Sequence, residues 1–170
     1  SVFDPPLPGI PTVVRFDRHR LVVKKNGRSL TDWLTDGTGP RCGRILAQIA
    51  RTLMGAHRRG FIHGGLHLRD IRVVGGDLTA LGGWERRFMS PSQQTVVKDD
   101  EHHFLAPEAL LGRELTPAAD VHSLAQLIQH VCMLDGLDSF LKTEIDDRQS
   151  LEGLLAHLSE HEDNIGLRPT

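Results

Sequence analysis

The stretch from residue 63 to residue 70 carries three side chains of types that bind metals or transfer protons. His63, His67 and Asp70 follow one another at spacings of four and three residues, between a predicted helix and a predicted strand. Two imidazoles and one carboxylate are ligands that zinc accepts, so a zinc site is one hypothesis for this stretch.

Periodic apolar residues predict the elements that position this loop. Ile45, Ile49 and Leu53 recur at a spacing of four residues, and similar patterns return later in the chain. Ser29 and Ser150 are predicted N-caps. The predicted helices span residues 30–34, 41–59, 118–133, 137–142 and 150–161. The predicted strands span residues 12–16, 20–24, 71–74 and 78–81, and residues 85–103 are a predicted long loop. The sequence therefore predicts a mainly α domain with β additions, of the α+β class.

Composition excludes several classes of function. Hydrophobic residues make up 39% of the chain and charged residues 25%, which is typical of a globular domain. No apolar run approaches the roughly 20 residues that a membrane span needs, and a formal net charge of −2 gives no overall attraction for nucleic acid. Basic residues near the start are predicted to form an exposed face of a hairpin rather than a nucleic-acid site; they are Arg15, Arg18, Arg20, Lys24 and Lys25.

The two cysteines, Cys42 and Cys132, form no Cys-x-x-Cys pair. Their positions in predicted helices favour buried free thiols over a metal or redox motif. This usage fits a reducing compartment, and residues 1–11 show no signal-peptide pattern. Together these observations predict a cytoplasmic protein.

Several segments stand in the order and spacing of motifs of the eukaryotic-type protein kinase family. Residues 62–70 (Ile-His-Gly-Gly-Leu-His-Leu-Arg-Asp) resemble the catalytic loop that follows a long helix. Residues 78–84 resemble the strand that leads into the magnesium-binding Asp-Phe-Gly motif. Residues 106–108 (Ala-Pro-Glu) with 119–121 (Ala-Asp-Val) look like the Ala-Pro-Glu motif and the helix after it. Residues 146–150 (Asp-Asp-Arg-Gln-Ser) are similar to the Asp-x-x-Arg-Pro-Ser turn before the final helix.

The resemblance covers nearly the whole chain and implies a protein-kinase-like C-lobe. Residues 1–28 would be remnant N-lobe strands and the hinge, and residues 29–170 the helical C-lobe with a small β hairpin. Most of the N-lobe would be truncated or absent. The residues to which the resemblance gives structural roles are His63 beneath the catalytic loop, Asp120 as acceptor of backbone N–H groups from that loop, and Glu108 with Arg148 as a buried ion pair.

The positions that the resemblance assigns to catalysis lack the side chains that catalysis needs. Phosphoryl transfer requires a carboxylate in the catalytic loop, magnesium ligands and a lysine on the phosphates. The loop carboxylate aligns with Gly65, and the Asp-Phe-Gly aspartate aligns with Gly82, or with Leu81 if the hairpin is one residue shorter. No Gly-x-Gly-x-x-Gly motif or matching N-lobe lysine occurs. Asp70 stands where the family has a metal-binding amide, and a carboxylate can hold magnesium.

These differences predict a catalytically inactive kinase-like domain, a pseudokinase, that uses no cofactor. It would be a regulatory protein-interaction module that binds a protein partner or a second copy through a surface at Leu21, Val22, Val23 and Trp84. The alternative is a divergent small-molecule, sugar or Ser/Thr kinase that binds ATP and magnesium through Asp70. The wording of the catalytic loop resembles bacterial lipopolysaccharide-type sugar kinases. A third hypothesis is an inactive sensor that binds ATP without magnesium.

Overall fold

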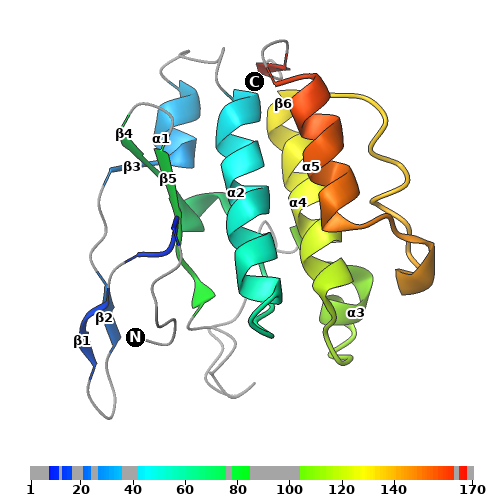
Figure 1. The fold of residues 1–170 in the computed structure, drawn as a ribbon, viewed down its shortest axis with the longest axis horizontal. Helices are drawn as coiled ribbons and strands as arrows, with labels where there is room; N and C mark the ends of the chain where they lie inside the picture. Colours follow the sequence, from blue (N-terminus) through cyan, green and yellow to red (C-terminus); the bar gives the residue numbers. More distant parts are fainter. Residues whose placement is uncertain are drawn as a thin grey trace.

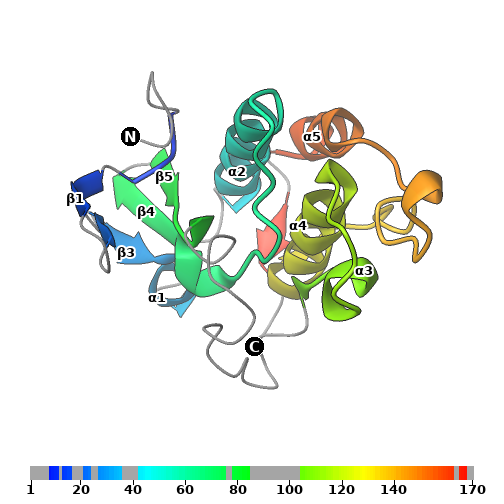
Figure 2. The same ribbon diagram turned by 90° about the horizontal axis from the view of Figure 1, so that it is seen from below.

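Helix α2 (Cys42–His57) lies between a small antiparallel sheet and two further helices (Figure 1, Figure 2). The computed structural model describes residues 8–11, 13–16, 21–23, 27–35, 42–75, 78–84, 104–162 and 165–167, with the backbone alone at residues 13–16, 21–23, 75 and 78. Helix α2 contacts α4 (Pro117–Val131), α5 (Leu151–Glu160) and strand β5 (Leu78–Leu81). The hydrophobic core forms where these elements meet.

The sequence of α2 explains both its packing and its end. Ile45 and Leu53 are among the apolar residues that recur on one face, and both are fully buried. The helix predicted over residues 41–59 is therefore confirmed, although it ends at His57. The N–H of Gly60 then donates to the C=O of His57 at 2.9 Å, with Gly60 at a φ of 77°. This left-handed glycine ends the helix and directs the chain into the loop of residues 61–70.

Helices α4 and α5 also follow from the sequence. Helix α4 begins after Thr116 with Pro117 at its first position, where the missing N–H has no cost. Helix α5 begins after Ser150, whose hydroxyl accepts the N–H of Gly153 at 3.2 Å. Both predicted helices and the predicted Ser150 N-cap are confirmed. A short helix, α3 (Pro107–Leu110), precedes α4.

A small antiparallel sheet packs on the other side of α2. Its strand order is β3 (Arg28–Ser29), β4 (Ile71–Gly75) and β5. Ile71 pairs with Leu81, and both side chains are fully buried. The predicted hairpin of β4 and β5 is confirmed, whereas the sequence does not predict β3, because a two-residue strand has no periodic pattern.

Helix α1 (Leu30–Thr35) follows β3 without a gap and agrees with the predicted short helix. The hydroxyl of Ser29 accepts the N–H of Asp32 at 3.1 Å, so Ser29 is the N-cap, as predicted. Leu30 and Trp33 are buried and join the core. The helix therefore fixes β3 to the body of the fold.

Two further strand pairs complete the architecture. Strands β1 (Val13–Phe16) and β2 (Leu21–Val23) form the predicted N-terminal hairpin, which Figure 1 shows apart from the three-stranded sheet. The loop between them lies outside the described residues. Strand β6 (Cys132–Met133) pairs with β7 (Gly166–Leu167), a pair too short to predict. Helices and small antiparallel sheets together make this an α+β structure.

The helix predicted over residues 137–142 is wrong. The chain forms a turn there, in which the N–H groups of Phe140 and Leu141 donate to C=O groups three residues back, at 3.0 and 3.3 Å. The C=O of Ser139 accepts the N–H of Gln149 at 3.0 Å, and the C=O of Lys142 accepts Nε–H of Arg148 at 2.6 Å. Tertiary hydrogen bonds therefore override the local helical preference.

The predicted division between residues 28 and 29 falls inside β3, and both residues of that strand pair with β4. The long loop predicted at residues 85–103 lies outside the described residues. In the part of the chain that the structure describes, no helix is long and apolar enough to cross a membrane.

Candidate functional site

One carboxylate ties the loop of residues 61–70 to α4. Asp120, in the first turn of α4, is fully buried, and its two oxygens accept the backbone N–H groups of His63 and Gly64, each at 2.8 Å. Gly64 has a φ of 74°, which glycine adopts at low cost. The Nε2 atom of His57, at the end of α2, is also 2.8 Å from Asp120. The start of the loop is thus held by hydrogen bonds to a single side chain.

His63 connects the loop to the end of β5. Its side chain is buried, and its Nε2 lies 2.7 Å from the C=O of Gly82. Because a carbonyl oxygen only accepts, Nε2 carries the proton and donates it. The ring packs edge-on against Trp84 with centroids 4.7 Å apart, and the indole N–H of Trp84 donates to the C=O of Leu81 at 2.8 Å. His63 therefore joins the loop to the segment that follows β5 through a hydrogen bond and a ring contact.

The loop does not form the zinc site that its residue types suggest. His63, His67 and Asp70 do not form a group of three side chains whose ligand atoms lie close together. Within the described residues, the one group of three metal-binding side chains with ligand atoms close together lies on α5 instead. The hypothesis of zinc bound by His63, His67 and Asp70 is therefore not supported by the geometry.

Asp70 lies at the other end of the loop, in the short helix η2 (Leu68–Asp70). Its backbone C=O accepts the N–H of Gly82 at 2.8 Å. Its half-buried carboxylate lies against Gly83, because a Cβ on Gly83 would be only 2.8 Å from Cγ of Asp70. Gly83 also has a φ of 86°. The predicted metal ligand therefore lies directly beside the two glycines that follow β5.

Gly65 and Gly82, at the predicted catalytic positions, are not required by the backbone. Neither has a positive φ. A Cβ at Gly65 would meet the side chain of Leu105 at 3.5 Å, and one at Gly82 would meet the C=O of Asp70 at 3.5 Å, which are ordinary van der Waals distances. The fold therefore has room for a Cβ at both positions, although the sequence supplies none.

Glu108 and Arg148 join α3 to the turn before α5. The guanidinium of Arg148 donates to both carboxylate oxygens, at 2.6 and 2.8 Å, and both side chains are buried. Its other N–H bonds donate to the C=O groups of Ala118, Lys142 and Thr143. Such a bidentate pair with satisfied donors is among the strongest arrangements of two charged side chains.

The surroundings of this ion pair change the pKa values of two groups. Burial acts to raise the pKa of Glu108, but hydrogen bonding and the charge of Arg148 outweigh it, so the pKa lies below its ordinary value of 4.5. Burial first, and then the charge of Arg148, lower the pKa of His122 below 6.5. At neutral pH an ionised carboxylate and a neutral imidazole are therefore favoured here.

The residues of the predicted interaction surface lie in two separate places, on strand β2 and beside the core. Leu21, Val22 and Val23 form β2, and their side chains lie outside the description. Among the described strands, β1 and β2 pair only with each other. Trp84 is half-buried and packs against the core.

No protein-family model and no curated protein sequence matches this chain. The geometry of the loop therefore carries the functional argument. Sequence reasoning does not identify His57 as a partner of Asp120, because a separation of 63 residues leaves no local pattern. The sequence also does not show that position 83 requires glycine, since the positive φ of Gly83 is visible only in the folded backbone.

Proposed function

We propose that this chain is the C-lobe of a protein-kinase-like fold that has lost phosphoryl transfer and acts as an interaction module. One observation supports the proposal most directly. Asp120 holds the backbone N–H groups of His63 and Gly64, while the next residue, Gly65, has no side chain. The loop is thus positioned by a buried carboxylate but has no catalytic carboxylate of its own at the aligned position.

The chemistry of phosphoryl transfer supports the loss of activity. Catalysis of this reaction is almost entirely positioning and charge stabilisation by carboxylates, metal ions and cations. Gly65 cannot orient a hydroxyl nucleophile, and Gly82 cannot bind magnesium. Loss of a single charge-stabilising group lowers rates by factors of roughly 10² to 10³. Both of these positions have lost such groups, and among the positions aligned with the catalytic motifs Asp70 keeps a side chain that can bind a metal ion.

The proposed role of the inactive domain is binding, and the β1–β2 hairpin is the proposed binding surface. Since neither strand has a second strand partner among the described residues, a strand from another protein or from a second copy can pair with the hairpin. Strand pairing of this kind draws its affinity from backbone hydrogen bonds. The proposed partner is therefore a protein segment that binds in extended form.

Sedimentation velocity of matched variants tests this surface. Val22→Glu places a charge in the centre of β2 and should therefore weaken self-association. For a partner other than a second copy, the same variant should weaken capture of that partner from lysate. Leu111→Glu is the matched control, since Leu111 is 63% exposed and lies after α3. If Leu111→Glu weakens association and Val22→Glu does not, the binding surface lies at α3 and the hairpin is excluded.

A thermal-shift titration with ATP tests the loss of nucleotide chemistry. A ligand of the native state at 100 times its Kd stabilises by about 2.7 kcal/mol, which raises Tm measurably. We expect no rise in Tm with ATP alone, with magnesium or with manganese. Asp120→Asn, which should lower Tm, shows in parallel that the assay detects changes in stability.

The alternative proposal is a divergent kinase, and the position of Asp70 beside Gly82 and Gly83 favours it. It predicts a metal-dependent rise in Tm with ATP and measurable ATP turnover, both abolished in Asp70→Ala. That result would overturn the inactive assignment. A rise in Tm that needs no metal would instead support a nucleotide sensor.

A further inference from the structure

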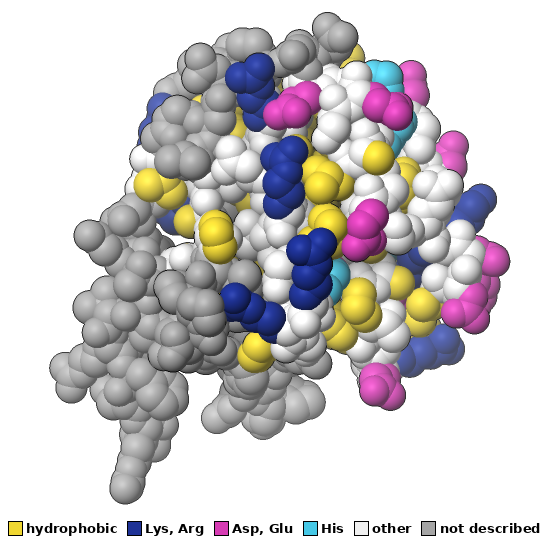
Figure 3. All heavy atoms as spheres, viewed as in Figure 1, with side chains coloured by type: hydrophobic (Ala, Val, Ile, Leu, Met, Phe, Trp, Pro, Cys, Tyr) yellow, Lys and Arg dark blue, Asp and Glu magenta, His cyan; other side chains and the backbone are white. Residues whose placement is uncertain are grey.

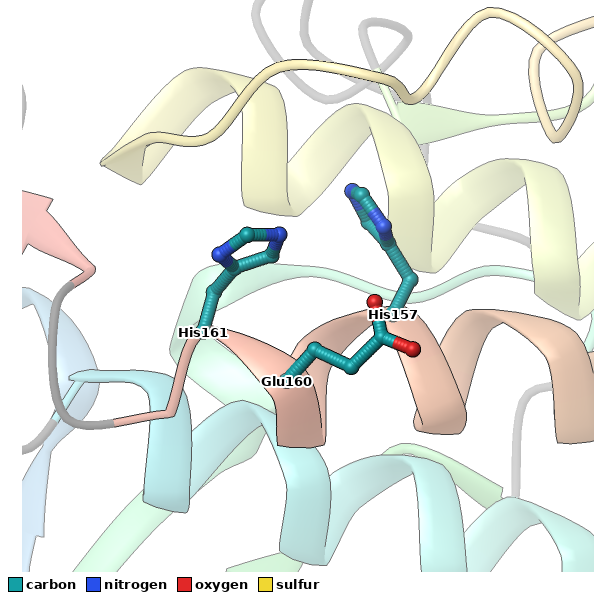
Figure 4. A group of neighbouring side chains, drawn as sticks. All are labelled: His157, Glu160 and His161. Carbon is teal, nitrogen blue, oxygen red and sulfur yellow. The ribbon is translucent and has the colours of Figure 1, made fainter.

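The end of α5 carries three potential metal ligands. His157, Glu160 and His161 stand at positions i, i+3 and i+4, which share one face of a helix. Figure 4 shows the three side chains on the same side of the helix end, with the carboxylate of Glu160 directed toward His157. One ligand atom from each residue lies within 4.8 Å of the other two. The imidazole rings of the two histidines stand edge to face, with centroids 5.2 Å apart.

His157 is held in one tautomer by the segment that follows β6. Its Nε2 lies 2.7 Å from the C=O of Asp135, so Nε2 carries the proton and Nδ1 keeps the lone pair. Gly136 permits this approach, because it has a φ of 79° and a Cβ there would be 3.0 Å from the ring of His157. A carbonyl that orients an imidazole in this way is the usual support for a metal-binding histidine.

The charge and shape of the surroundings favour a cation. The two histidines line a pocket of about 370 Å³ together with residues 133–136. No Lys or Arg occurs between residues 149 and 162, and the exposed Asp135 adds a negative charge. Figure 3 shows acidic side chains beside histidine at the end of the molecule where α5 ends in Figure 1. Arg44 of α2 lies 3.8 Å from Glu162, so part of this acidic charge is offset, and the feature that favours a metal ion is the set of nitrogen and oxygen ligands.

We propose that His157, Glu160 and His161 form a zinc-binding site. Zinc takes histidine nitrogen and carboxylate oxygen, whereas magnesium and calcium are bound mainly by oxygen. Three protein ligands would leave a fourth position for water or for a group from a bound molecule. The site shares no residue with the loop of residues 61–70, so it does not depend on the proposed function.

Calorimetric titration of zinc chloride into the full chain, after removal of metals with EDTA, tests the site. We expect one zinc ion per chain and no binding heat with magnesium. Affinity should be weaker at about pH 5.5 than at about pH 7.5, because protons compete for the imidazoles. His161→Ala should weaken binding by roughly tenfold or more, and Glu160→Gln by a smaller factor, because each removes one ligand.

His130→Ala is the matched control, since His130 is an exposed histidine in the last turn of α4. Its zinc affinity should equal that of the wild type. His157→Ala also removes the hydrogen bond to Asp135, so the decisive variants are the exposed His161→Ala and Glu160→Gln, with circular dichroism to verify folding. Zinc binding of unchanged strength and stoichiometry in His161→Ala would overturn the proposal. A wild-type chain that does not bind zinc at about 1 mM would overturn it too.

Discussion

Helices α2 and α4 run antiparallel and contact each other at both ends (Figure 1). The contact at one end is between charged or polar side chains, and the contact at the other end is between two thiols. At one end, the imidazole of His57 bonds to the buried carboxylate of Asp120, which also holds the loop of residues 61–70. At the other end, the sulfur atoms of Cys42 and Cys132 lie 2.6 Å apart, and both side chains are fully buried. The carboxylate, which is costly to bury, stands where a loop must be positioned, whereas small, weakly polar side chains suffice where the two helices pack together.

The polar end should be the more sensitive to mutation. Asp120→Ala leaves two backbone N–H groups and the His57 ring without their acceptor, so we expect a loss of about 3–5 kcal/mol in the free energy of unfolding. Asp120→Asn should cost less, because the amide oxygen still accepts. Urea unfolding monitored by circular dichroism measures both. Asp70→Ala, at the other end of the same loop, is the comparison and should cost about 1 kcal/mol or less. Equal losses at the two positions would contradict this account of the loop.

The ion pair of Glu108 and Arg148 should make stability depend on pH. Since the pKa of Glu108 is lower in the folded chain than in the unfolded chain, the unfolded chain binds more protons between the two values. The contribution of the pair is therefore complete above pH 4.5 and is lost as the pH falls through the lower, folded pKa. The lowered pKa of His122 adds a loss of stability that begins as the pH falls below 6.5.

Glu108→Gln tests this assignment. It breaks a buried ion pair but keeps a hydrogen-bond acceptor, so we expect a loss of about 2–3 kcal/mol at neutral pH. Urea unfolding over a series of pH values should show a flatter dependence below pH 4.5 in the variant than in the wild type. A parallel dependence in the two proteins would mean that other carboxylates dominate acid unfolding.

The long helices could be predicted from sequence because each carries its own apolar period. Helix α2 needs no information from other segments to be recognised. The turn at residues 137–142 could not be predicted, since its carbonyl groups are engaged by Gln149 and Arg148. Strands β3 and β6 are two residues long, so they carry no readable alternation.

The contacts of the candidate site are harder to predict from the sequence than the helices and strands. The contacts of Glu108 with Arg148 and of Asp120 with His63 span 40 and 57 residues, and only the resemblance to a family suggested them. The spacing of His157, Glu160 and His161 can be read from the sequence, but the C=O of Asp135 that orients His157 cannot. Long-range backbone groups are the part of a site that residue types do not reveal.

Glycines on the loop and directly after β5 should separate into required and dispensable positions. Gly83→Ala forces a Cβ against the carboxylate of Asp70 at a φ of 86°, so we expect a loss of about 1–3 kcal/mol. Gly65→Ala should change stability by about 0.5 kcal/mol or less, because its Cβ meets ordinary distances. Adding Asp70→Ala to Gly83→Ala should recover the steric part of the loss and leave the backbone part. Failure to recover any stability would show that φ alone accounts for the cost.

The sulfur end of the α2–α4 pair should give the smallest effect. Its hydrogen bond with Cys42, and then burial, raise the pKa of the Cys132 thiol, so the reactive thiolate is scarce. We expect both thiols to resist a thiol reagent in the native protein and to react in denaturant. Cys132→Ala should cost about 1 kcal/mol, because it removes one buried sulfur without leaving an unpaired charge. If denatured protein shows no reactive thiol until a reductant is added, the two sulfurs are bonded. A disulfide at this end would stabilise the contact between the two helices as strongly as Asp120 does at the other end, so the two ends would no longer differ in their sensitivity to mutation.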